Sequence, residues 1–187
     1  EAMHVFTAPP VSRPVTYTDY RTLATTVTGI TTEGTSTWTC ADGHSFAEGQ
    51  KVLVKSTDVR PSTSGGVLAE YEVLYVFGAT GTTFQLGATD ESADVAITNV
   101  GTGTITVTAA QMDSGTLYFG PGEHRIGRLF GVGSNVEIYL DSGSVVIGNF
   151  EAIGAEGSSV TGRGMLAGTF ANYIDDNLEA LSGAEAL

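Results

Sequence analysis

The chain has 187 residues, of which 41% are hydrophobic and only 16% charged, with 25 glycines and a net charge of −13. The low charge, the many apolar residues and the lack of a G-X-Y repeat exclude a coiled coil, a highly charged disordered chain and a collagen. The excess of 21 acidic over 8 basic residues argues against nucleic acid and anionic membrane surfaces as partners, because both are negatively charged.

The sequence also predicts neither a membrane-spanning helix nor an intrachain disulfide. No apolar run reaches the ~18–20 residues of a membrane-spanning helix, so we expect no membrane insertion. Cys40 is the single cysteine, so no intrachain disulfide is expected.

The first segment, residues 1–23, contains Pro9, Pro10 and Pro14, and we expect it to be an extended lead-in. Residues 24–108 then alternate short apolar stretches with Gly, Ser, Thr and Asp, which is typical of a compact all-β module, an antiparallel sandwich or barrel. The predicted strands are Thr25–Ile30, Ser36–Cys40, Lys51–Lys55, Glu70–Phe77, Thr83–Leu86, Val95–Val100 and Thr102–Thr108.

Residues 109–187 show a loose repeat of about 20 residues. Leu117, Ile138 and Val160 form one series with separations of 21 and 22 residues. Ile126, Val146 and Met165 form a second with separations of 20 and 19. Such spacings favour stacked coils of a β solenoid, with glycines at the corners. The alternative is an ordinary β-sandwich of hairpins with similar lengths. A short C-terminal helix is expected over Asn172–Leu181.

The segments 116–127, 134–150 and 160–168 resemble the first coils of a right-handed parallel β-helix of the pectin-lyase type. This pattern is shared by dextranase-like and polygalacturonase-like glycoside hydrolases and by bacteriophage tailspikes. The resemblance implies the start of a β-helix over residues 109–187.

A second resemblance lies upstream. The segments 43–54, 71–73 and 82–86 are similar to a small β module found in phage tail and fibre proteins. In this reading Gly43 and Gly49 close turns, while Phe46, Val52 and the pair Phe84 and Leu86 point into the core.

Candidate catalytic groups are few. Asp175 and Asp176 are adjacent, so their side chains diverge and do not form the facing carboxylate pair of a glycoside hydrolase. The acidic residues of the resembled hydrolases lie on later coils, and none corresponds to a position in this chain. Ser142 and Ser144 lack the G-x-S-x-G context of a serine hydrolase. We therefore assign no catalytic residue.

Binding motifs are equally sparse. His4, His44 and His124 are isolated, and no Cys/His cluster or EF-hand loop is present, so no metal or cofactor is expected. We interpret the acidic pair Asp90 and Glu91 as solvated surface.

The glycines at 101–103 and 162–168 lack the context of a phosphate-binding or dinucleotide-binding loop. The aromatic residues of the proposed coils could stack on sugars, but core or subunit packing is the favoured interpretation. They are Tyr118, Phe119, Phe130, Tyr139 and Phe150.

The leading hypothesis is a virion structural protein of a bacteriophage: a tailspike, fibre or related peripheral component, assembled as a homotrimer beside other virion proteins. It would provide a β scaffold for attachment to a host surface polysaccharide. The first alternative is the N-terminal part of a polysaccharide-degrading β-helix enzyme, a glycoside hydrolase or lyase, and secreted. The second is a capsid decoration or head-fibre protein. We expect no enzymatic activity of this segment by itself.

Overall fold

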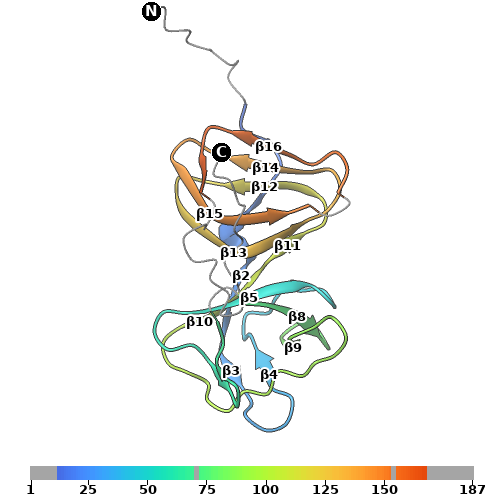
Figure 1. The fold of residues 1–187 in the computed structure, drawn as a ribbon, viewed down its shortest axis with the longest axis vertical. Helices are drawn as coiled ribbons and strands as arrows, with labels where there is room; N and C mark the ends of the chain where they lie inside the picture. The colour runs from blue at the N-terminus through green and yellow to red at the C-terminus, as the bar shows by residue number, and fades with distance from the viewer. Residues whose placement is uncertain (1–11, 70–71, 153–154, 168–187) are drawn as a thin grey trace, which may run out of the picture.

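The computed structural model describes residues 12–69, 72–152 and 155–167, and almost all of its regular structure is β. The prediction of an all-β fold is confirmed. Figure 1 shows two parts, a stack of strands in its upper half and a curved sheet below.

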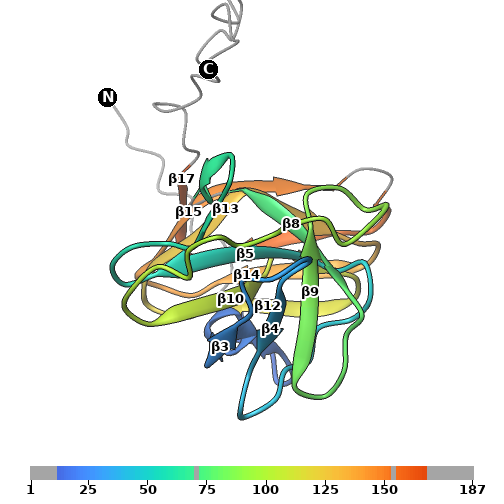
Figure 2. The ribbon, with the colours of Figure 1, turned by 90° about the horizontal axis from the view of Figure 1, so that it is seen from below.

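The lower part is one antiparallel sheet with the strand order β2-β10-β5-β8-β9-β4-β3. Its two edge strands, β2 and β3, are separated in the chain only by Thr28, whose backbone N–H donates to the carbonyl of Thr39 at 2.7 Å. One continuous segment thus supplies both edges, and the sheet curls into a barrel (Figure 2). The strands are β2 (Ala24–Val27), β3 (Gly29–Ile30), β4 (Thr37–Thr39), β5 (Lys51–Ser56), β8 (Val73–Phe77), β9 (Thr83–Gly87) and β10 (Ile105–Ala109).

Inward-facing apolar residues fill this barrel. Phe46, Val52, Phe84 and Leu86 all belong to its core, as does the fully buried Trp38. The alternation of buried and half-buried residues in β8 and β9 is the period-two pattern of a strand with one core face.

Two sequence expectations in this module were wrong. Val95–Val100 is not a strand, because Val95 and Ile97 are buried as anchors of an irregular loop and the backbone of Val95 bonds to Ser36 and Leu86. The serines and glycines of the stretch 62–66 predict a loop, but the stretch contributes to the small hairpin of β6 (Ser62–Thr63) and β7 (Gly66–Val67). Gly66 has a φ of +127°, which allows the tight turn.

The upper part consists of two parallel sheets, and the chain passes between them in each coil. One sheet has the order β1-β12-β14-β16 and the other β11-β13-β15-β17. All strand pairings of these two sheets in the described residues are parallel, which rules out the hairpin alternative for these strands. The strands are β1 (Thr18–Asp19), β11 (Gln111–Met112), β12 (Gly115–Phe119), β13 (Gly122–Val132), β14 (Val136–Leu140), β15 (Ser144–Glu151), β16 (Ser159–Gly162) and β17 (Met165–Ala167).

The first predicted register is confirmed, since Leu117 pairs with Ile138 and Ile138 pairs with Val160. The second predicted register is wrong. Val146 pairs with His124 and Leu166, not with Ile126 and Met165. The register of β13 against β15 also shifts after Arg125 and again after Gly127, and Ile126 has no register partner in β15.

The barrel packs against β13 and β15 of the coil stack through the outward row of β5. Lys51 forms an ion pair of 3.1 Å with Glu151, and the Lys55 ammonium donates to the carbonyl of Arg125 at 2.8 Å. Between them Leu53, 1% exposed, lies against Gly127. Both faces of β5 are therefore buried, one in the barrel and one against the coils.

The lead-in joins the coil stack rather than standing apart from it. β1 pairs in parallel with β12 and is followed by the 3-10 helix η1 (Tyr20–Leu23). Tyr20 is buried and donates its hydroxyl to the carbonyl of Arg125 at 2.6 Å. The expected helix over 172–181 lies outside the described residues.

Candidate functional site

Two tyrosines on neighbouring strands form the centre of the outer face of the β12–β14 sheet. Tyr118 and Tyr139 are register partners whose rings stack with centroids 6.1 Å apart. Tyr118 donates its hydroxyl to Asp141 at 2.5 Å, and this bond is the main cause that raises the pKa of Tyr118 to about 12 and lowers the pKa of Asp141. The carboxylate of Asp141 is thus already bound by the protein itself.

A second carboxylate on this face is also occupied. Glu137 accepts the hydroxyls of Thr116 at 3.3 Å and Thr161 at 2.9 Å, which lie on the strands to either side. The three strands are therefore linked by side chains as well as by their backbones. The face is organised for cohesion of the stack.

The lead-in covers part of this face. The guanidinium of Arg13 lies over the rings of Tyr17 and Tyr118, 5.0 and 4.4 Å from their centroids. Tyr118 and Tyr139 are only 2% and 4% exposed. Neither ring offers a surface on which a sugar could stack.

The predicted coil aromatics therefore divide into two groups, and both are packed. Phe119, Phe130 and Phe150 meet between the two parallel sheets with centroids about 6 Å apart. Tyr118 and Tyr139 point to the outer face and are buried there. The packing interpretation of these residues fits the structure.

The described histidines bond to nearby backbone. His44 contacts the carbonyl of Thr83 at 3.2 Å and accepts the N–H of Phe46, on whose ring it stacks. His124 is 5% exposed and bonds to the carbonyl of Gly120 at 2.7 Å. His4 lies outside the described residues.

The remaining sequence candidates are not brought together. Ser144 is buried, and its hydroxyl has no hydrogen-bond partner in the described structure. Ser142 is exposed in the turn after Asp141, and Asp90 and Glu91 are exposed on a barrel loop. Asp175 and Asp176 lie outside the described residues.

Residues 12–69, 72–152 and 155–167 contain neither a metal-binding cluster nor a membrane-spanning helix. No group of three or more His, Cys, Asp or Glu side chains is arranged to hold a metal ion there. No helix in that part of the chain is long and apolar enough to cross a membrane.

The barrel carries a partly open pocket of about 410 Å³ that the sequence did not indicate. It lies between the β6–β7 hairpin, the start of β8 and the loop that follows β9. Two carboxylates, Glu72 and Asp94, line it. The other lining residues are Thr63, Ser64, Gly65, Gly66, Val67, Leu68, Leu74, Ala88, Val95 and Ala96.

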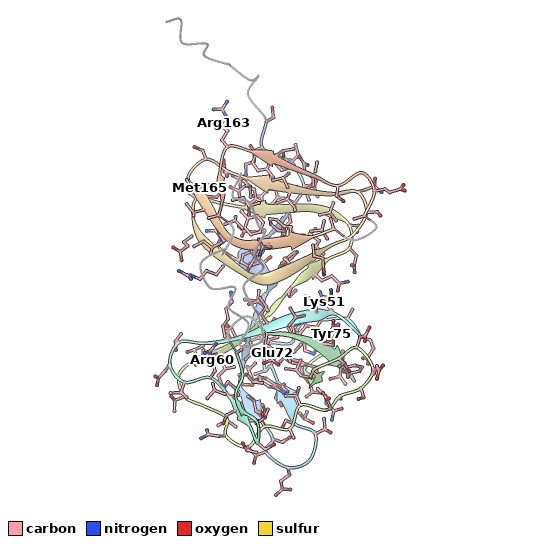
Figure 3. The ribbon with its side chains drawn as sticks, in the orientation of Figure 1. Lys51, Arg60, Glu72, Tyr75, Arg163 and Met165 are labelled. Atoms are coloured by element: carbon pink, nitrogen blue, oxygen red, sulfur yellow. The ribbon has the colours of Figure 1, made fainter. Side chains whose placement is uncertain are left out.

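The last described coil presents a second notable surface. Each of β16 and β17 has a hydrogen-bonded neighbour on one side only within the described chain. Val160 and Leu166 are 52% and 44% exposed, whereas their register partners Ile138 and Val146 are 3% and 0% exposed. Positions that belong to the apolar interior of the stack are thus exposed at this end, where Figure 3 also labels Arg163 and Met165.

Comparison of the chain with protein-family models, with curated proteins and with solved structures finds no match. The assignment of a function therefore depends on the residues and the geometry. The resemblance to pectin-lyase-type and phage proteins stays a prediction.

Proposed function

We propose that this chain is a non-catalytic β scaffold of a bacteriophage virion, a tailspike-type or fibre-type peripheral component that serves attachment to the host surface. The observation that supports it is that the two ends of the coil stack differ. The barrel and the buried Tyr20 contact β13 near one end of the stack, whereas β16 and β17, the last described strands, have exposed edges and exposed apolar side chains within the described part of the chain.

An open end of this kind favours association. Unpaired strand edges can pair with further β structure, and a few coils bury too little surface to be stable alone. Burial of Val160, Met165 and Leu166 against identical chains would remove apolar surface from water. We propose a homotrimer as the assembled form, with other virion proteins as neighbours.

The mass of the chain in solution tests the assembly. Light scattering at micromolar concentration should give the mass of a trimer, and Val160→Ser should lower it. Val59→Ser is the matched control, because Val59 is 49% exposed on the barrel, away from the last coil. A monomer mass for the unchanged chain, or an equal effect of the two substitutions, would contradict the proposed assembly.

Attachment is tested separately. The labelled chain should bind intact host cells and lose that binding when the surface polysaccharide is removed. The same polysaccharide, incubated with the chain, should release no reducing ends. Release of reducing sugar would favour the hydrolase alternative instead.

A further inference from the structure

We propose that the barrel pocket binds a primary ammonium group carried on an aliphatic stem, as in a free alkylamine or the side chain of a partner's lysine. The proposal is independent of the virion assignment, because a soluble amine tests it on any form of the protein. Figure 3 labels Glu72, one of its two acidic residues, on the barrel below β5.

Each carboxylate of the pocket is held by one backbone bond. Oε2 of Glu72 accepts the N–H of Ala69 at 3.3 Å, and Oδ1 of Asp94 accepts the N–H of Ala88 at 2.7 Å. Neither carboxylate has a further hydrogen bond or an ion pair with a side chain in the described part of the chain. The second oxygen of each remains available to accept a hydrogen bond from a ligand.

The rest of the lining fits the stem of such a ligand. Val67, which is 58% exposed, supplies accessible apolar surface, and the buried side chains of Leu68, Leu74 and Val95 also belong to the lining. The pocket has the size of small-molecule sites, which span roughly 300–1,000 Å³. No lysine, arginine or histidine is among the described lining residues, so a cation meets no positive side chain there.

A bare divalent ion fits this lining less well. Calcium requires about six to eight oxygen ligands, and the pocket supplies two carboxylates. An ammonium group needs only three acceptors, and the hydroxyls of Thr63 and Ser64 belong to the same lining. A charged head with an apolar tail thus matches the carboxylates and the apolar residues of the pocket lining.

The two carboxylates can be neutralised without loss of their backbone bonds. Glu72→Gln and Asp94→Asn keep a carbonyl oxygen that accepts the N–H of Ala69 or Ala88, so we expect both variants to fold. Glu91→Gln is the matched control. It removes the same charge from the same barrel loop as Asp94, but Glu91 does not line the pocket.

The experiment is a titration with n-butylammonium followed by ¹H–¹⁵N correlation spectra. The amides of Ala69 and Ala88 are local reporters, because they donate to the two carboxylates. We expect both signals to shift and saturate. 1-Butanol should bind at least about twofold more weakly, since each of the two exposed charge pairs contributes about 0.2–1 kcal/mol. A second arm with Nα-acetyl-lysine-N-methylamide distinguishes the sources: tighter binding than butylammonium points to a partner's lysine, and equal or weaker binding to a free amine.

Glu72→Gln and Asp94→Asn should each weaken binding about two- to fivefold, and Glu91→Gln should leave it unchanged. If all three variants weaken binding alike, the net charge of the protein and not the pocket attracts the amine. That result, or spectra in which neither reporter amide moves with either amine, would overturn the proposal.

Discussion

Substitution of Gly127 by alanine tests the contact between the barrel and the coils. Gly127 has a φ of +84°, and a Cβ placed there would lie 2.4 Å from Cδ1 of Leu53. The left-handed backbone costs an L-residue about 1–2 kcal/mol. The added methyl group costs about 1–3 kcal/mol more, because Leu53 is buried and cannot move away freely. Gly127→Ala should therefore lower the free energy of unfolding by about 2–5 kcal/mol.

Gly122→Ala isolates the backbone part of this cost. Gly122 has a φ of +116°, and no atom lies within 4 Å of a Cβ built there. It should cost only about 1–2 kcal/mol, and the effect of alanine on the unfolded chain is common to both variants and cancels in the difference. Leu53→Val completes the test, since valine lacks the Cδ atoms that the new methyl group would meet. In that background Gly127→Ala should cost little more than Gly122→Ala.

Urea unfolding followed by the fluorescence of Trp38 measures these values. Trp38 is the single tryptophan of the chain and is fully buried in the barrel core. Far-UV circular dichroism in parallel reports the coils as well. An equal cost for Gly127→Ala and Gly122→Ala, or no relief from Leu53→Val, would refute the argument that Leu53 fills the space beside Gly127.

Three further predictions concern single interactions. Removal of either partner of the Lys51–Glu151 ion pair should cost about 0.5–1 kcal/mol, and a double-mutant cycle at low and high salt should show a coupling that salt weakens. The pKa of Tyr118 is raised in the folded protein, so its contribution to the free energy of unfolding should be full below pH 10 and be lost as the pH rises toward 12. Unfolding curves of the unchanged chain and of Tyr118→Phe over this pH range test whether the difference in stability decreases as the pH rises. The thiol of Cys40 is fully buried and its pKa is raised by that burial, so a thiol reagent should react with it only at the rate of unfolding, and fast reaction in native buffer would contradict its buried position.

The sequence predicted the fold where one side of a strand faces a core. Leu117, Ile138 and Val160 have the same role in successive coils, so their spacing indicated the register correctly. The same reasoning failed for Val146, because His124 and Ile126 are both buried on β13, and the apolar pattern selected Ile126 although His124 is the register partner. In β17 the error was one residue, Met165 instead of Leu166, and adjacent residues of a strand point to opposite faces.

The pocket was beyond sequence analysis for a different reason. It is assembled from a hairpin near residue 65 and a loop near residue 92, which the barrel brings together. Glycine, serine and short apolar residues in such loops indicate turns and give no sign of a cavity. Glu72 and Asp94 also have ordinary surface exposure, so nothing in their sequence neighbours distinguishes them from other acidic residues.

The barrel and the parallel stack differ in how the unpaired edges of their β-sheets are covered. The barrel closes its sheet because β2 and β3 come from one continuous segment, which leaves no long edge for another chain. The parallel stack is not closed in this way, because the end strands of its two sheets have a hydrogen-bonded neighbour on one side only within the described chain. Over β13 and β15 the outward row of β5 provides the cover, with Leu53 as its apolar centre and a lysine on each side. At the last described coil no equivalent row is present in the described chain, and Val160 and Leu166 remain half exposed. Within the described residues, the exposed apolar side chains of the stack therefore lie at the end away from the barrel, and this is the surface that the proposed trimer would bury.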